Sequence, residues 1–189
     1  MACSAGRVKV SPLIPYFMNH CKIIPTFMVA IDFILKKSFT DFMTLKDYSG
    51  LKTLMEKKVP FNEHLKMSVD VIREGFCIVR VPWQDHLTGD TNRPAVHGGV
   101  LATLLDAAGG VAGWSLLENK NDRISTVDLR VDYLRPGPAK DMLCEAQVVR
   151  MGNKVCVVKM EIYSAGDDKE KIGPIATGQA VFNVAKNIR

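Results

Sequence analysis

Residues 96–114 read Val-His-Gly-Gly-Val-Leu-Ala-Thr-Leu-Leu-Asp-Ala-Ala-Gly-Gly-Val-Ala-Gly-Trp, and this stretch decides the fold. From residue 100 to 117 the side chains are apolar or small almost everywhere, over a length sufficient for a helix of about five turns. A helix that is apolar all round is either a membrane span or the buried centre of a soluble domain. Its single charge, Asp106, is costly in either place unless it is paired or used.

Strand-like segments surround this helix and favour the soluble alternative. They precede and follow it at residues 67–71, 77–81, 126–134, 142–150, 155–163 and 175–183. Glycines in the helix would also suit packing in lipid, but amphipathic strands need a soluble sheet for their backbone. We therefore expect no stable membrane span, and we expect the apolar run at 23–35, broken by Pro25 and Asp32, to be a docked or surface-lying segment.

The alternation of residues in these strands predicts an antiparallel sheet with one face on the helix. In 126–134 one face is expected to carry Val127, Leu129, Val131 and Tyr133, and the other Asp128, Arg130 and Asp132. In the last strand the expected inner face is Ala176, Gly178, Ala180 and Phe182, whose small members leave room for a helix. A further helix is predicted to start near residue 43 and to end at Pro60. The fold class is therefore α+β, a single curved antiparallel sheet wrapped around one long central helix.

Composition limits the organisation and the partners. The 189 residues carry a formal net charge of +5, and residues 1–42, with five basic and two acidic side chains, hold most of the excess. We expect residues 1–42 to be an N-terminal extension and residues 43–189 to be the folded domain. Without a basic stripe in that domain, we expect no nucleic-acid partner.

The cysteines and the N-terminus indicate the compartment. The five cysteines are odd in number and lack C-x-x-C or C-x-x-H spacing, so neither a disulfide framework nor a metal site is predicted. No signal-peptide pattern opens the chain. We expect a cytoplasmic protein, or an organellar one if residues 1–42 act as a targeting segment.

Four short segments together are characteristic of a known family. His97-Gly98-Gly99 is followed by residues 101–106, Leu-Ala-Thr-Leu-Leu-Asp, then by Thr126-Val127-Asp128-Leu129 and by Tyr133-Leu134-Arg135-Pro136. This order resembles the PaaI-like branch of the hotdog-fold acyl-CoA thioesterases over about residues 51–185. The resemblance implies a hotdog fold, homodimers whose sheets join, often paired again as homotetramers, and hydrolysis of an acyl-CoA substrate without metal or other cofactor.

The resemblance also implies roles for individual residues. Asp106 matches the catalytic carboxylate, Gly98 the residue whose backbone N–H polarises the thioester carbonyl, and His97 the residue that helps order the site. Two positions depart from the family pattern. Its asparagine falls on Thr91, with Asn92 beside it, and its serine is replaced by Thr126 or its neighbour Ser125.

Further residues are predicted to contact the substrate. Asn92, Gly99 and Thr126 are candidates near the reacting bond, and glycine at 98 and 99 lets a substrate approach the backbone closely. Cations at strand ends or turns could bind the coenzyme A phosphates, and Arg135 and Lys154 are the candidates among them. Structural alternatives stay open: Asp106 as a carboxylate satisfied by local hydroxyls or amides, His97 as a helix-terminal residue, and the cations as solvated side chains.

Helix geometry adds a prediction about assembly. Gly98 and Asp106 are eight positions apart, which is about 12 Å along one helix, yet both must reach the same carbonyl. If both are catalytic, the carboxylate must come from a second copy of the chain, with two antiparallel helices related by a two-fold axis. Asp106 could act as a general base on water or as a nucleophile. Alternative functions are an acyl-thioester hydratase or dehydratase on the same fold, and a non-catalytic acyl-CoA-binding or sensor module.

Overall fold

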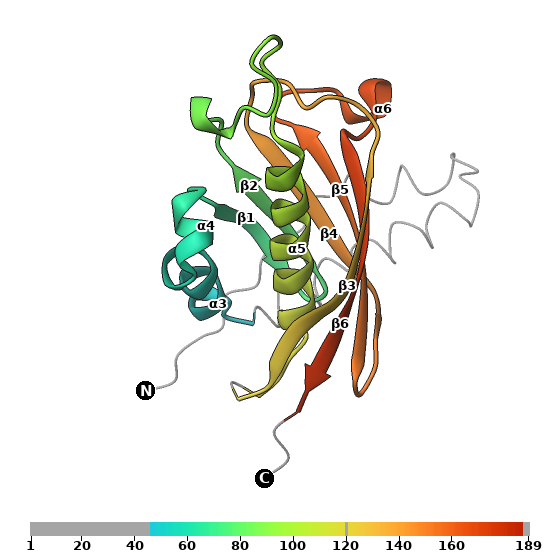
Figure 1. The fold of residues 1–189 in the computed structure, drawn as a ribbon. Helices are drawn as coiled ribbons and strands as arrows, with labels where there is room; N and C mark the ends of the chain where they lie inside the picture. The colour runs from blue at the N-terminus through green and yellow to red at the C-terminus, as the bar shows by residue number, and fades with distance from the viewer. Residues whose placement is uncertain (1–45, 120, 187–189) are drawn as a thin grey trace, which may run out of the picture. The chain divides into compact units, whose positions relative to one another are not determined.

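A computed structural model describes residues 46–119 and 121–186, and its centre is a helix lying across one face of a sheet (Figure 1). The sheet has the strand order β1-β2-β4-β5-β6-β3, and every neighbouring pair is antiparallel. Its strands are β1 Ser68–Arg73, β2 Phe76–Val81, β3 Arg123–Tyr133, β4 Met142–Met151, β5 Val155–Ser164 and β6 Ala176–Ala185. The predicted α+β class and all six predicted strands are confirmed. The predicted extension 1–42 and the boundary at residue 43 lie outside the described residues.

The central helix, α5, spans Gly98–Trp114 and ends three residues before the apolar run does. His97 caps its start with a side chain that accepts a hydrogen bond from the Gly99 N–H. At the other end the Ser115 hydroxyl donates to the Ala112 carbonyl and accepts from the Gly75 N–H of the β1–β2 turn. The last carbonyls of a helix have no partner within the helix. The Ser115 hydroxyl supplies one for Ala112, so the helix can end here. Among the described residues, none of the helices is long and apolar enough to cross a membrane.

Glycines let α5 lie close to the sheet. A Cβ on Gly109 would come within 2.7 Å of Met160 Sδ, and one on Gly113 within 2.5 Å of Ile124 Cδ1. From the sheet side, a Cβ on Gly178 would meet Leu105 at 3.2 Å. The prediction that small residues in the last strand make room for a helix is thus confirmed at Gly178.

The expectation that α5 is buried all round is wrong. Its sheet-facing side is buried, through Leu101, Leu104, Leu105, Ala108, Gly109, Val111, Ala112 and Gly113. The opposite side is only half-buried, and we call it the open stripe: Ala102, Thr103, Asp106, Ala107 and Gly110. One helix against one concave sheet covers only one side of that helix, so the charge of Asp106 lies on the side that the sheet leaves free.

The segment before β1 also differs from the prediction. A short helix α3, Ser49–Thr53, continues as a π-helical turn at Leu54–Lys58, and Pro60 then opens a new helix, α4, Pro60–His64. Proline is favoured at a first helical position because no N–H is needed there, so the residue that ends one helix begins the next. Two other short elements were not predicted, a 3-10 turn at Asp85–Leu87 and a helix α6 at Lys169–Ile172.

The close helix–sheet contact can be tested at Gly109. Replacing it with Ala forces the buried Phe182 ring and Met160 to shift, so we expect the free energy of unfolding to fall by about 1–2 kcal/mol. Gly50→Ala is the matched control, because a Cβ there meets nothing within 4 Å and alanine favours a helix by up to about 1 kcal/mol. Urea denaturation of both variants decides the point, and equal stabilities would contradict the close packing.

Candidate active site

Asp106 is held by one hydroxyl group. The Thr126 Oγ1 donates a hydrogen bond to Asp106 Oδ1 at 2.7 Å. In the part of the chain that the structure describes, no Lys, Arg or His lies at ion-pair distance from this carboxylate. The Thr126 hydroxyl therefore orients the carboxylate through Oδ1, and Oδ2 is available to another group.

A β-bulge in β3 turns Thr126 towards the helix. Thr126 is opposite Phe182 and Asp128 is opposite Val181, so Val127 is the extra residue. Phe182 is buried against α5, and directly opposite residues share one face of a sheet. Thr126 is therefore on the inner face, while Val127 is 67% exposed. The predicted place of Val127 on the same face as Leu129, Val131 and Tyr133 is wrong, because a bulge breaks the alternation of the strand and re-aims one side chain.

The bulge also decides between the two hydroxyls that the sequence offered. Ser125 is opposite Asn183 and is exposed, so it faces away from the helix. Leu129, Val131 and Tyr133 keep the inner face that their alternation predicts. The hydroxyl that meets Asp106 is that of Thr126.

The start of α5 presents an unused backbone donor. Gly98 is the first helical residue, and in the described part of the chain no acceptor is bound to its N–H. The Gly99 N–H is already used, because it donates to His97 Nδ1 at 2.9 Å. The first N–H groups of a helix carry partial positive charge. The Gly98 N–H can therefore polarise a bound carbonyl group, and the absence of a side chain on Gly98 lets that carbonyl come close.

Two further side chains bind the first turn, and sequence reasoning assigned neither of them a role there. The Tyr133 hydroxyl donates to the Gly98 carbonyl at 3.1 Å, and Thr103 Oγ1 donates to the Gly99 carbonyl at 2.8 Å. Tyr133 comes from β3, 35 residues away along the chain. Such a contact leaves no local sequence pattern.

The loop before α5 places Asn92 at its tip. The base of the loop is closed by a bridge between Thr88 and Val96, and the His97 N–H donates to the Leu87 carbonyl. The backbone of Gly89 packs closely against His97, because a Cβ at Gly89 would lie 2.6 Å from the His97 Cα. The Asn92 N–H donates to Asp90 Oδ1. Within the described residues, no hydrogen bond joins the Asn92 side chain to Asp106 or Thr126.

One chain does not bring Gly98 and Asp106 together. Both lie on the continuous helix α5, and eight residues of helix span about 12 Å. Each is instead joined separately to β3, Asp106 through Thr126 and Gly98 through Tyr133. The structure thus supplies two half-sites per chain.

The two predicted phosphate-binding cations lie at opposite ends of the sheet. Arg135 follows Tyr133, which pairs with the start of β6, whereas the Lys154 carbonyl accepts from Val184 near the end of β6. Arg135 is already engaged, since its Nη2 donates to the Gly173 carbonyl at 2.8 Å and lies 3.8 Å from Asp167. Lys154 is exposed, and the described residues form no ion pair with it.

Asp167 is the centre of the cluster that holds Arg135. The Ser164 hydroxyl bound to it, and then Lys140 and Arg135, lower the pKa of its carboxyl. These contacts connect the segment after β5 to the turn before β4. We interpret Arg135 as part of this connection.

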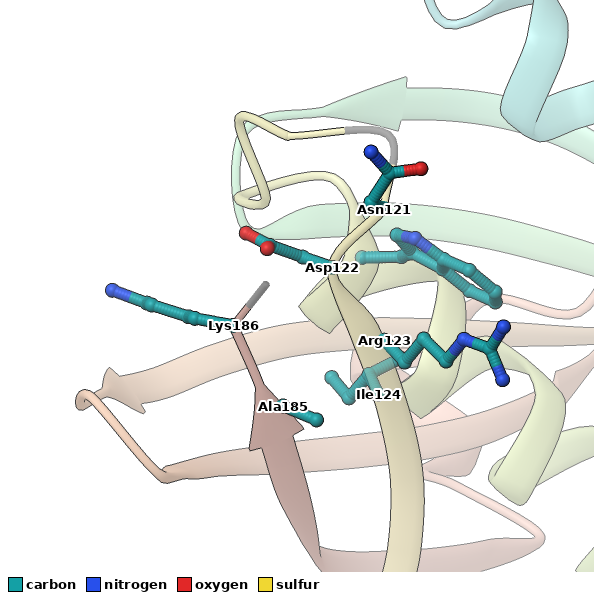
Figure 2. Close-up of a pocket in the computed structure, with 7 residues that line it drawn as sticks. Asn121, Asp122, Arg123, Ile124, Ala185 and Lys186 are labelled. Carbon is teal, nitrogen blue, oxygen red and sulfur yellow. The ribbon is translucent and has the colours of Figure 1, made fainter. Parts of the chain in front are cut away.

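A hollow of about 690 Å³ lies at the other end of α5 from Gly98 (Figure 2). Its lining consists of Trp114, Asn121, Asp122, Arg123, Ile124, Ala185 and Lys186. Neither Gly98 nor Asp106 belongs to it, and the Arg123 and Lys186 side chains point away from each other. Among the described residues, no group of three or more His, Cys, Asp or Glu side chains could hold a metal ion.

Comparisons with known proteins indicate the family of this chain. The profile of the thioesterase superfamily matches residues 94–171, a span that includes Gly98, Asp106 and Thr126. A Halobacterium salinarum protein that carries the name "Putative esterase" is 34% identical over 126 residues, and the match covers 65% of this chain and 83% of that protein. The medium/long-chain acyl-CoA thioesterase YigI of Escherichia coli is 33% identical over 118 residues, covering 56% of this chain and 76% of YigI.

A solved structure has a similar fold. The thioesterase family protein from Silicibacter pomeroyi superimposes with a TM-score of 0.62 at 26% identity. The superposition covers 69% of this chain and 92% of that protein.

Proposed function

Because the chain belongs to the thioesterase superfamily, we propose that it is a thioester hydrolase that converts an acyl-CoA to a free acid and coenzyme A. The observation that carries this proposal is the pair of half-sites on α5. One is the Asp106 carboxylate held on one oxygen by Thr126, and the other is the unused Gly98 N–H. The acyl-CoA substrate class is inferred from the relative YigI, which is named for that activity.

Asp106 supplies the oxygen chemistry in this proposal. As a general base, its free oxygen takes a proton from water while the water oxygen bonds to the thioester carbonyl. The tetrahedral adduct then collapses, the carbon–sulfur bond breaks, and the thiolate of coenzyme A leaves and is protonated. As a nucleophile, the same oxygen would bond to the carbonyl carbon and expel the thiolate, and water would then hydrolyse the anhydride. Both routes need one carboxylate oxygen free, which the single bond from Thr126 allows.

Gly98 supplies the electrophilic assistance. Its N–H lies at the positive end of α5, and one such donor to a developing oxyanion contributes about 3 kcal/mol to transition-state stabilisation. His97 supports this role by binding the neighbouring Gly99 N–H, so that the Gly98 N–H is the group left for substrate. In this assignment Gly99 contributes space for the substrate rather than a hydrogen bond.

Two chains complete each site in the proposed homodimer. The open stripe of α5 is available to a second helix, and among the described strands β3 lies at the edge of the sheet and pairs with β6 alone. Exposed edge strands invite pairing with another chain, and this edge exposes the apolar side chains of Val127, Tyr133 and Leu134. In an antiparallel helix pair, Gly98 of one subunit meets Asp106 of the other when the two-fold axis passes beside Ala102, halfway between them. Pairing of dimers into tetramers stays a prediction from the sequence.

The remaining proposed contacts follow from this pairing. Antiparallel helices bring the Lys154 end of one subunit towards the Gly98 end of the other, so we propose Lys154 as a contact for the coenzyme A phosphates. Asn92, on the loop before α5, is proposed to line the entrance. Arg135 is proposed to act on the phosphates only through the segment it holds, since its guanidinium is bound to Gly173.

The cytoplasm is the proposed compartment. Cys77, Cys144 and Cys156 are free and buried, and burial raises the pKa of Cys77 to about 12. Thiols in such surroundings are unreactive. These three cysteines act as small apolar residues of the core, as their positions in the strands predict. Free thiols are typical of a reducing compartment.

Asp106→Asn tests the proposed activity directly. We expect thiol release from a panel of acyl-CoA esters, acetyl to long-chain, to fall by about 10²- to 10⁴-fold in the variant. Absorbance of an enoyl product is recorded in parallel. Enoyl formation without thiol release would support a hydratase instead, and absence of turnover by the wild type with tight acyl-CoA binding would support a sensor.

Gly98→Pro tests the backbone donor and the shared site together. Proline removes the N–H and adds a ring whose Cβ Gly98→Ala also carries, is favoured at a first helical position, and suits the extended conformation of His97. We expect Gly98→Pro to be inactive and Gly98→Ala, which keeps the N–H, to stay active. Mixing Gly98→Pro with Asp106→Ala subunits should restore about a quarter of wild-type activity, because half of the dimers then contain one intact site. No recovery after verified subunit exchange would contradict a shared site.

Thr126 is tested with a pair of substitutions of similar size. Thr126→Val removes the bond to Asp106 and should lower kcat by roughly 10-fold, as expected for a group that orients a catalytic base. Thr126→Ser keeps the hydroxyl and should retain most of the activity. Steady-state kinetics with one acyl-CoA ester compares them, and a wild-type kcat in Thr126→Val would contradict an orienting role of the hydroxyl.

A further inference from the structure

The first turn of α5 must be open to a substrate and must also hold its backbone N–H in a fixed direction. Gly98 and Gly99 leave the backbone open to a substrate, but two adjacent glycines also give that backbone more conformational freedom than any other pair of residues. A donor that stabilises a transition state must keep its direction, since a misplacement of about 1 Å can cost up to about 10²-fold in rate. Something outside the glycines must therefore fix this turn.

The structure fixes the peptide group between Gly98 and Gly99 from both sides. Its carbonyl oxygen accepts a hydrogen bond from the Tyr133 hydroxyl at 3.1 Å. Its N–H donates to His97 Nδ1 at 2.9 Å. This peptide group directly follows the one that carries the Gly98 N–H, and the two share the Gly98 Cα, so holding one limits rotation of the other.

The Tyr133 ring also lies beside Gly98. A Cβ built on Gly98 would be 3.4 Å from Tyr133 Cε1, so the ring faces the side of the glycine that carries no side chain. Tyr133 reaches this place from the end of β3, on the inner face that also carries Thr126. One strand therefore contacts both half-sites, Thr126 at Asp106 and Tyr133 at Gly98.

We propose that Tyr133 is a positioning residue for thioester hydrolysis, which acts through the Gly98–Gly99 peptide to keep the Gly98 N–H aimed at the substrate carbonyl. The inference rests on the proposed function of Gly98. Tyr133 itself touches neither the carbonyl nor Asp106 in this assignment. Its hydroxyl thus affects the transition state more than the binding of the ground-state substrate.

Tyr133→Phe, which removes only the hydroxyl, is the test variant. Tyr163→Phe is the matched control, because it also removes one hydroxyl bond, to Glu161, away from α5. We expect kcat for octanoyl-CoA to fall about tenfold in Tyr133→Phe with KM changed by less than about twofold, and the control to match the wild type. Equal kcat in Tyr133→Phe and wild type would overturn the inference.

Two inhibitors separate positioning from general packing. S-octyl-CoA lacks the carbonyl, whereas the ketone analogue with CH₂ in place of sulfur keeps it. Tyr133→Phe should weaken inhibition by the ketone and leave the thioether unaffected. Equal weakening of both would overturn the inference, since it would indicate a disturbed pocket rather than a misdirected donor.

Hydrogen exchange tests the inference without an activity assay and distinguishes a local effect on α5 from a general loss of folding. Hydrogen exchange of a peptide spanning residues 97–104 should be faster in Tyr133→Phe than in wild type, and a peptide from β5 should be unchanged. Uniformly faster exchange, or no change at 97–104, would contradict the inference. The proposed function fails separately, if the wild type does not hydrolyse acyl-CoA or if Asp106→Asn keeps full activity.

Discussion

The separation of Gly98 and Asp106 on one rigid helix is the constraint on which the proposed site depends. A helix rises by about 1.5 Å per residue, so no side-chain movement within a chain can close the gap between the two groups. The remaining features of α5 are consistent with this constraint. The sheet covers one side of the helix and leaves the open stripe that carries Asp106 uncovered.

Strand β3 follows α5 along its length in the opposite direction. Ile124 lies against Gly113 near the helix end, Thr126 bonds Asp106 in the middle, and Tyr133 bonds Gly98 at the start. An edge strand thus orients both half-sites while its free edge remains able to pair with another chain. A central strand could make the same side-chain contacts but could not also extend the sheet into a partner.

Periodicity and motif order were sufficient to predict the fold, the strand segments, the central helix and membership of the hotdog-fold thioesterases. They failed where two local interpretations were equally compatible with the sequence. Pro60 both ends one helix and begins another, and the alternation through Val127 gave no sign of a bulge. The bonds of Thr126 and Tyr133 to α5 arise from tertiary contact over 20 and 35 residues. The resemblance suggested Thr126, but without it neither bond could have been predicted from local sequence.

The environment of Asp106 limits how a second helix can pack. An ionised carboxylate removed from water without a partner is strongly destabilising, and the described residues give Asp106 a single hydroxyl donor and no cation. A dry, tightly packed helix pair would leave its second oxygen unsatisfied. Three of the four other residues on the open stripe, Ala102, Ala107 and Gly110, are small, and the fourth is Thr103. In the proposed helix pair they would leave space for a water molecule or a thioester, so the spacing that satisfies the carboxylate would also admit the reactants.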